Sequence, residues 1–218
     1  MDKLIEIKDV MASYNGNPAI WEINLDIMRN DFLFITGPNG GGKTTLLKVI
    51  LGLLKPNSGT VTFYRNGKSV KALKMGWLPQ MNPLDRRFPI SVYEVIASGL
   101  LAENSVCKRL TREQKQRIDE TLAEMLLEPF AARAIGELSG GQLQRALLGR
   151  AIVSNPEILI LDEPDTYIDK DFEMRFRDII EVRSVKSAIV LVSHNVGLLK
   201  PFVKHTVKID QTIQNQTL

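Results

Sequence analysis

Short segments of alternating or continuous apolar residues open the chain and predict β-strands. Leu4–Val10 and Ile20–Ile27 alternate apolar and polar positions, and a turn at 15–18 separates them. The two segments therefore predict an antiparallel β opening. Phe32–Thr36 is instead a short apolar strand that runs into a glycine-rich loop, and a helical spacing of leucine and isoleucine follows, ending near Gly52.

Further strand signals come next, followed by a long stretch of helical character. We expect a strand at Thr60–Tyr64, a hairpin turn at Asn66-Gly67 and a short strand at Met75–Leu78. Residues 91–154 lack strand alternation and are rich in Leu, Ala, Glu, Arg and Gln. They therefore predict a helical region inserted into the β-containing chain, interrupted by a loop at Gly136–Gly141.

Two continuous apolar segments dominate the rest of the chain. Ile158–Leu161 and Ala188–Val192 have the composition of buried strands in a parallel sheet, and a helix is expected between them. The tail predicts a short strand pair at most. Together these elements predict an α/β fold of one large domain or two small ones, with a helical part at 91–154 between the β-containing parts 1–90 and 155–218.

Composition narrows the range of functions. The chain has 218 residues and a net charge of +3, so it lacks the concentrated basic field that holds nucleic acid. No apolar run approaches the roughly 18 residues of a membrane span, and the N-terminus lacks the features of a signal peptide, so we expect a cytoplasmic protein. One cysteine and two histidines exclude an internal disulfide and a zinc cluster, so any bound metal should have oxygen ligands.

The glycine-rich loop carries the strongest chemical signal. Residues 37–44 match the phosphate-binding pattern G-x-x-x-x-G-K-[ST] between a predicted strand and a predicted helix, although a simple glycine turn is the alternative. Lys43 should reach the β and γ phosphates, and Thr44 should offer its hydroxyl to Mg²⁺. The expected nucleotide-binding residues are those of the loop and the helix start, namely Gly37, Pro38, Asn39, Gly40, Gly41, Gly42, Lys43, Thr44 and Thr45.

Two adjacent carboxylates end the apolar strand at Ile158–Leu161, where a parallel sheet presents its ligand crevice. Asp162 is suited to hold Mg²⁺ through a water, and Glu163 is suited to polarise the water that attacks a γ-phosphate. A strand that merely ends in a polar turn is the alternative. Ser193-His194 ends the next strand in the same way, so three candidate sites should meet at one edge of the sheet.

A second glycine turn, Leu138-Ser139-Gly140-Gly141-Gln142, opens another predicted helix. Such a turn is a potential anion site, yet one nucleotide does not need two of them. The pentapeptide could equally be a simple helix N-cap, with Ser139 as the capping residue.

The four segments 37–44, 138–142, 158–163 and His194 together resemble the nucleotide-binding subunit of ABC transporters over almost the entire chain. The resemblance implies the ABC ATPase fold on a phosphate-loop core, with ATP and Mg²⁺ as cofactors. It also implies a head-to-tail homodimer that sandwiches two ATP molecules. Each ATP would contact the phosphate loop of one subunit and Ser139, Gly140, Gly141 and Gln142 of the other.

The resemblance assigns roles to individual residues as well. Tyr14 matches the aromatic residue that stacks on adenine, although ordinary packing is the alternative. Gln80 matches the glutamine that contacts Mg²⁺, Asp169 matches the aspartate of the loop that crosses the dimer interface, and His194 matches the switch histidine at the γ-phosphate. The segment 165–169 lacks the small residues usual before that aspartate, and Asn195 replaces a frequent acidic residue.

The resemblance further implies hydrolysis coupled to a separate membrane permease and an extracytoplasmic substrate-binding protein, with this subunit peripheral on the cytoplasmic face of the inner membrane. The apolar segment 80–90 is the candidate docking surface, unless it packs on its own domain. The motifs look most like those of importers of zinc, manganese or iron. An exporter, a soluble ABC ATPase acting on ribosomes or DNA, and a phosphate-loop kinase are the alternatives.

Overall fold

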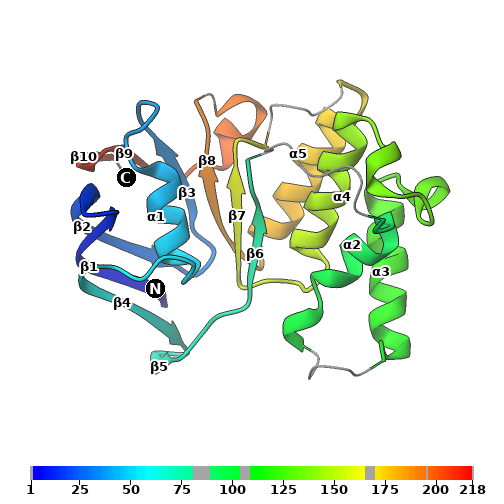
Figure 1. The fold of residues 1–218 in the computed structure, drawn as a ribbon, viewed down its shortest axis with the longest axis horizontal. Helices are drawn as coiled ribbons and strands as arrows, with labels where there is room; N and C mark the ends of the chain where they lie inside the picture. The colour runs from blue at the N-terminus through cyan, green and yellow to red at the C-terminus, as the bar shows by residue number, and fades with distance from the viewer. Residues whose placement is uncertain (1, 81–88, 104–108, 165–169, 195, 218) are drawn as a thin grey trace.

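The computed structural model describes residues 2–80, 89–103, 109–164, 170–194 and 196–217. Two sheets and the helices around them make up this part of the chain (Figure 1). The antiparallel sheet has the order β2-β1-β4-β5, and the larger sheet has the order β10-β9-β3-β8-β7-β6. Asp169, most of the segment 80–90 and the segment 165–169 lie outside the described residues.

The antiparallel sheet confirms the β opening, with longer strands than the pattern indicated. Its strands are β1 (Lys3–Tyr14), β2 (Asn17–Met28), β4 (Ser58–Arg65) and β5 (Lys68–Val70). The expected turn at 15–18 was wrong in length. Asn15 and Gly16 have φ angles of 50° and 81°, and two such residues complete a tight hairpin turn. Pro18 can therefore pair with Ser13, and it is tolerated there because β2 is the edge strand of this sheet.

The central sheet contains the parallel strands that the sequence predicts. Its strands are β3 (Phe32–Thr36), β6 (Met75–Leu78), β7 (Ile158–Asp162), β8 (Ala188–Val192), β9 (His205–Asp210) and β10 (Thr212–Thr217). The expectation for the tail was too modest, because β9 pairs in parallel with β3 and β10 pairs with β9 in the antiparallel direction. The tail therefore extends the central sheet and does not form a separate pair.

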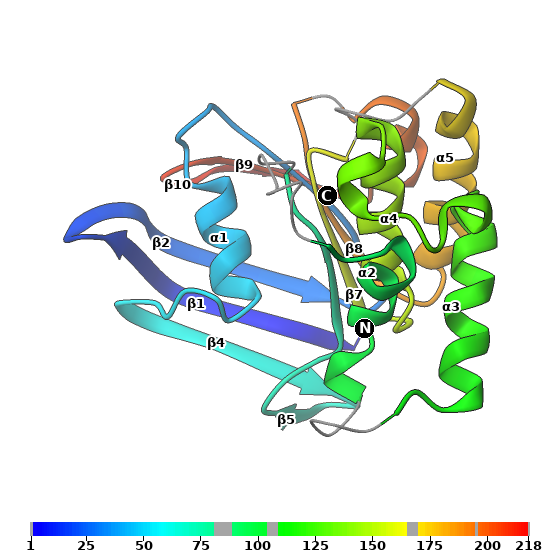
Figure 2. The same ribbon diagram turned by 45° about the vertical axis from the view of Figure 1, so that its right-hand side comes forward.

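Neighbouring residues of the central strands point to two different hydrophobic cores. Leu33 of β3 packs with β1, β2 and helix α1 (Lys43–Ile50), whereas the adjacent Phe32 packs with the remaining helices. Ile160 and Leu161 of β7 divide in the same way. Because side chains alternate along a strand, the sheet is covered on both faces, as Figures 1 and 2 show.

Four helices cover the second face in the described part of the chain. They are α2 (Val92–Ser98), α3 (Arg112–Glu124), α4 (Gly140–Ile152) and α5 (Lys170–Ser184). Ser91, Thr111 and Ser139 each form a capping box with the residue three positions later. The predicted loop at Gly136–Gly141 is shorter than expected, because the 3₁₀ turn Ile135–Glu137 and the early start of α4 take up most of it. Other 3₁₀ turns are Leu101–Glu103, Glu128–Phe130 and Gly197–Phe202.

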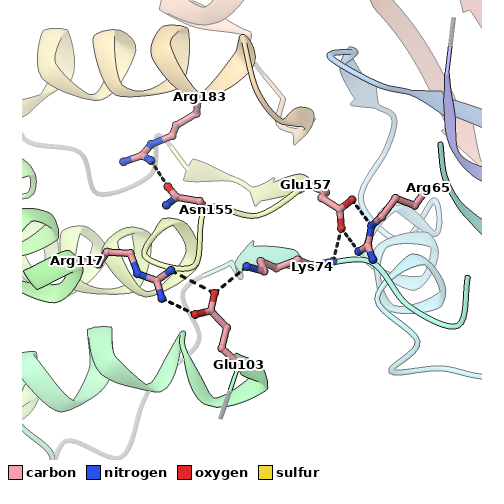
Figure 3. Close-up of polar contacts among 7 residues, drawn as sticks. All are labelled: Arg65, Lys74, Glu103, Arg117, Asn155, Glu157 and Arg183. Atoms are coloured by element: carbon pink, nitrogen blue, oxygen red, sulfur yellow. Dashed lines mark hydrogen bonds and ion pairs between the residues drawn. The ribbon is translucent and has the colours of Figure 1, made fainter. Parts of the chain in front are cut away.

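Polar contacts connect the parts of the molecule near the amino ends of β6 and β7 (Figure 3). Glu157 accepts hydrogen bonds from the Arg65 side chain and, at 3.1 Å, from the Lys74 backbone N–H. The Lys74 ammonium lies 2.8 Å from Glu103, which also pairs with Arg117 of α3. This series therefore joins the antiparallel sheet, the central sheet and the helical region.

Candidate functional site: a phosphate pocket at the carboxyl edge of the central sheet

The phosphate loop connects β3 to α1 in a backbone conformation that requires glycine. Gly37 has φ of 146°, and a Cβ built there would lie 1.9 Å from the carbonyl oxygen of Ile209. Gly42 has φ of 93°, and its Cβ would lie 2.3 Å from Cγ2 of Ile20. Gly42 also precedes α1 without any side-chain cap, so the first N–H groups of this helix remain available to an anion.

Lys43 is the buried cation of this loop. Its side chain ends at the loop carbonyls, and Nζ donates to the oxygens of Gly37 at 2.8 Å and Pro38 at 2.9 Å. Lys43 is only 8% exposed, so its charge is shielded from water. An ammonium group has three donors, and the loop carbonyls therefore position the charge without using all of them.

The loop and the ends of the neighbouring strands enclose one cavity of about 220 Å³. Its lining includes Gln80 after β6, and Asp162 and Glu163 at the end of β7. The loop and α1 supply the other lining residues, which are Asn39, Gly40, Gly42, Lys43, Thr44 and Thr45. The phosphate loop and the two acids thus meet at one edge of the sheet, because parallel strands bring their carboxyl ends together there.

Asp162 is the buried acid of the cavity, with an exposed fraction of 3%. Burial, together with the charge of Glu163, raises the pKa of Asp162 to about 6, and this rise is opposed by Lys43 and by a hydrogen bond with Thr44. The Thr44 hydroxyl, the Asp162 carboxylate and the Gln80 amide are hard oxygen donors of the kind that Mg²⁺ prefers. In the described part of the chain no cluster of three or more His, Cys, Asp or Glu side chains could hold a metal ion.

Glu163 and His194 lie side by side at the rim of this cavity. Glu163 has a φ of 52°, and its N–H donates to the carbonyl of Val192 at 2.8 Å. Nε2 of His194 lies 3.6 Å from Oε1 of Glu163 and 3.0 Å from Oδ1 of Asn39. Residues from three separate segments thus converge around one point, as expected for the two acids and the histidine.

The second glycine turn lies elsewhere in the fold. Ser139 is the N-cap of α4, with its Oγ accepting from the Gln142 N–H at 3.2 Å, while Gln142 returns a bond to the Ser139 N–H. Ser139 therefore caps this helix, and its hydroxyl hydrogen remains able to donate to a further acceptor. Helix α4 and helix α1 lie on opposite faces of the central sheet (Figure 2).

Tyr14 ends β1 with a partly open ring. It is 42% exposed, and the ammonium of Lys48 on α1 lies 5.5 Å from its ring centre. The ring therefore adjoins the helix that follows the phosphate loop. Whether it stacks on an adenine stays a prediction.

The sequence pattern did not indicate that Gln144 contacts the turn beside Glu163. It follows the glycine turn on α4, is 4% exposed and donates from Nε2 to the carbonyl of Pro164, the residue after Glu163. A signal was present in the sequence, because Gln144 falls on the apolar stripe that Leu148 and Ala151 continue. A glutamine on such a stripe needs a hydrogen-bond partner.

A phosphate loop, a buried strand-end aspartate and an adjacent glutamate define the class of phosphate-loop nucleotide-binding proteins. The profile of the family described as ABC transporter matches residues 20–166. The chain therefore belongs to the ABC transporter family, as one of its ATPase cassettes. No helix in the described segments is long and apolar enough to cross a membrane.

Individual relatives narrow the comparison. The chain is 34% identical over 211 residues to the high-affinity zinc uptake system ATP-binding protein ZnuC of Bacillus subtilis, covering 95% of this chain and 91% of that protein. It is 31% identical over 216 residues to the manganese transport system ATP-binding protein MntA of Synechocystis, covering 97% and 83%. The dimeric structure of a bacterial ABC transporter cassette superposes with a TM-score of 0.82 at 25% identity, covering 98% of each chain.

Proposed function

We propose that this chain is the ATP-hydrolysing subunit of an importer that moves a divalent metal cation, zinc, manganese or iron, through a separate membrane permease. The observation that carries the hydrolysis is the cavity in which a buried lysine, Asp162 and Glu163 face one another beside the uncapped start of α1. The metal cargo is supported by relatives that are named as zinc and manganese uptake subunits.

ATP would bind with its β and γ phosphates in the phosphate loop. The backbone N–H groups at the start of α1 and the Lys43 ammonium supply positive charge where negative charge gathers during phosphoryl transfer. Thr44, Asp162 and Gln80 would hold Mg²⁺, which neutralises charge on the phosphate oxygens when bound. We assign adenine stacking to Tyr14.

Glu163 is the proposed general base. Its carboxylate lines the cavity and can accept a proton from a water that attacks the γ-phosphate. His194 reaches the same rim and, with a hydrogen on Nε2, can donate to a γ-phosphate oxygen. The proton therefore goes from water to Glu163, and the water oxygen bonds to the γ-phosphorus while the bond to the β–γ bridging oxygen breaks and ADP leaves. The histidine would orient the γ-phosphate during this step.

In this proposal the glycine turn at the start of α4 does not contact the ATP in the phosphate loop of its own subunit. We infer a head-to-tail homodimer in which Ser139, Gly140, Gly141 and Gln142 contact the nucleotide of the partner subunit. The position of α4 on the other face of the sheet from α1 supports this role, because the turn and the phosphate loop begin helices on opposite sides. Asp169, outside the described residues, is proposed to cross that interface.

The remaining assignments follow from this assembly. We propose one ABC ATPase domain with its core at 1–90 and 155–218 and its helical part at 91–154. The permease would dock at the segment 80–90, and a substrate-binding protein would complete the importer outside the membrane. The subunit itself would sit on the cytoplasmic face of the membrane, with no nucleic-acid partner.

The purified chain with Glu163→Gln tests the catalytic assignment. The variant should bind ATP and Mg²⁺ as the unmodified chain does, lose most of its turnover and accumulate as an ATP-bound dimer. The exposed Glu128→Gln variant is the matched control and should hydrolyse ATP normally. Wild-type turnover in Glu163→Gln would reject the proposed base.

Cells that carry only the Glu163→Gln subunit test the cargo. Uptake of zinc, manganese and iron, measured separately with radioactive ions, should fall for the transported cation alone. Capture of the subunit from gently solubilised membranes should also yield a multi-span permease. Unchanged uptake of all three cations would reject the metal cargo while leaving ATP hydrolysis standing.

A further inference from the structure

Gln144 is a buried polar side chain on the apolar face of α4. Only 4% of it is exposed, and its Nε2 donates to the backbone carbonyl of Pro164. Its Oε1 has no hydrogen-bond partner within the described residues. A buried amide with an unsatisfied oxygen destabilises a protein, so its presence here points to a role for its remaining bond, the one to Pro164.

The carbonyl that Gln144 binds belongs to a strained turn. Glu163 has a φ of 52°, in the left-handed region that residues other than glycine rarely adopt. A following proline makes helical backbone conformations still less favourable for this residue. Strain of this kind persists only where the surrounding structure enforces it.

Two hydrogen bonds enclose the strained residue. On one side the Glu163 N–H donates to Val192 of β8 at 2.8 Å, and on the other side the Pro164 carbonyl accepts from Gln144. The first bond fixes the turn to the central sheet, and the second fixes it to α4. Together they hold the backbone on both sides of the Glu163 side chain.

The direction of the Glu163 side chain depends on this backbone conformation. In the strained turn it lines the phosphate cavity and places Oε1 3.6 Å from Nε2 of His194. Relaxation to an extended backbone would turn the Cα–Cβ bond, and with it the carboxylate, to another direction. A displacement of about 1 Å at a reacting group can lower a rate by about a hundredfold.

We propose that Gln144 is a positioning residue for hydrolysis: its amide holds the Glu163–Pro164 turn in the conformation that directs the Glu163 carboxylate into the phosphate cavity. Because Gln144 lies in the first turns of α4, it also ties this turn to the helix that begins at the glycine loop 139–142. The inference rests on the proposed hydrolytic function.

A purely space-filling role for Gln144 is the competing explanation. The void beside it measures only about 10 Å³ and is lined by Leu148, Phe172 and Phe176 among others. The site therefore has room for a side chain of the size of glutamine and little more. Methionine has nearly the same length and volume, yet it lacks both the donor and the unsatisfied oxygen.

The test is the ATPase activity of the purified full-length chain with Gln144→Met. We expect kcat to fall by about tenfold, while KM for ATP changes by less than about twofold. The melting temperature should change little, because removal of the unsatisfied buried oxygen offsets the loss of the donor to the Pro164 carbonyl. A space-filling role would leave kcat unchanged, since methionine fills the same volume.

Gln114→Met is the matched control. Gln114 is 6% exposed on α3, and its amide oxygen accepts from the Thr111 N–H at 3.0 Å, which completes a capping box far along the chain from Pro164. This variant should lose thermal stability and retain kcat. A fall in kcat of the same size in both variants would show that general destabilisation explains the effect, and would overturn the inference.

Gln144→Leu serves as a second variant without the donor, in case the first folds poorly. Failure of both to fold would overturn the inference, because it would show that the residue serves packing. The unmodified chain separates the two proposals. If it does not hydrolyse ATP, the proposed function fails. If it hydrolyses ATP and Gln144→Met matches its kcat, only the positioning role fails.

Discussion

Nε2 of His194 lies 3.0 Å from Oδ1 of Asn39, a residue 155 positions earlier in the chain. Because an amide oxygen can only accept, Nε2 must carry a hydrogen. The Asn39 side chain therefore keeps His194 in the form that can donate from Nε2 at the rim of the phosphate cavity. The fold itself thus holds the histidine with the Nε2 hydrogen that a phosphate oxygen needs.

Nitrogen NMR of ¹⁵N-labelled protein tests this arrangement, since the chain has only two histidines. At pH 8 His194 should show hydrogen on Nε2, whereas His205, whose Nδ1 lies 3.1 Å from Asp31, should show it on Nδ1. Asn39→Ala should shift His194 toward a tautomer mixture and leave His205 unchanged. Hydrogen on Nδ1 of His194 in the unmodified chain would contradict the arrangement.

The middle of the central sheet was predictable because its strands are buried on both faces. β3 and β8 begin and end at the predicted residues, since continuous apolar runs bounded by loops leave little choice of register. The edge strand β6 also begins and ends as predicted, although only alternate residues of it are buried. β9 was not predictable in the same way. His205–Asp210 alternates like an edge strand, and only tertiary contacts show that it pairs with β3.

Some features of the candidate site could also be predicted from local sequence, whereas others depend on tertiary contacts. The phosphate loop and Asp162 were predictable because their pattern and their place at strand ends are local. The positive φ of Glu163 was not, because the sequence there predicts no left-handed residue before a proline. The bond between Gln144 and Pro164 joins residues 20 positions apart, and it exists only once α4 packs on the sheet.

Gly42→Ala should weaken ATP binding and lower stability. A Cβ at this position would meet Cγ2 of Ile20 at 2.3 Å and the carbonyl oxygen of Ala19 at 2.8 Å, on top of a φ of 93°. We expect a loss of about 2–3 kcal/mol in the free energy of unfolding and at least about tenfold weaker ATP binding. Urea denaturation and a fluorescent ATP analogue measure the two effects.

Gly52→Ala is the control at the other end of α1. Gly52 has a φ of 70°, and a Cβ there meets nothing within 4 Å. Its substitution should cost only about 1–2 kcal/mol from backbone strain and leave ATP affinity unchanged. Equal effects of the two substitutions on ATP affinity would show that the contact with Ile20 does not shape the phosphate loop.

Glu103 should make the stability of the fold sensitive to acid. The hydrogen bond from Arg117, with a smaller contribution from Lys74, lowers the pKa of Glu103 to about 2 (Figure 3). A carboxyl group with a lowered pKa in the folded state stabilises the fold above its unfolded pKa, near 4.5. That contribution is lost as the pH falls from about 4.5 toward 2.

Glu103→Gln measures this contribution. At pH 7 the variant should be less stable by about 1–2 kcal/mol, a figure reduced for partial exposure of the side chain to water. The difference from the unmodified chain should shrink as urea midpoints are measured at pH 5, 4 and 3. The exposed Glu128→Gln variant, which removes the same charge, is measured beside it as the control. A difference that does not vary with pH would mean that packing, and not the ion pair, is responsible.

For Asp162 we expect the opposite dependence of stability on pH, because its buried carboxyl group resists ionisation. Its pKa is raised to about 6, first by burial and then by the charge of Glu163. Below pH 3.8, near the unfolded pKa, the acid is neutral in both states and does not lower the stability. As the pH rises from there through 6, ionisation favours the unfolded state and stability is lost. A shift of roughly two units corresponds to about 3 kcal/mol of lost stability at pH 8.

Asp162→Asn should therefore stabilise the nucleotide-free chain at pH 8 by up to about 3 kcal/mol and leave it nearly unchanged at pH 4. The same variant should lose Mg²⁺-dependent ATP hydrolysis, because the amide no longer supplies an anionic oxygen. Melting temperatures in EDTA at the two pH values, with ATPase assays beside them, test both halves. A variant that is less stable than the unmodified chain at pH 8 would show that the ionised Asp162 carboxylate does not destabilise the fold.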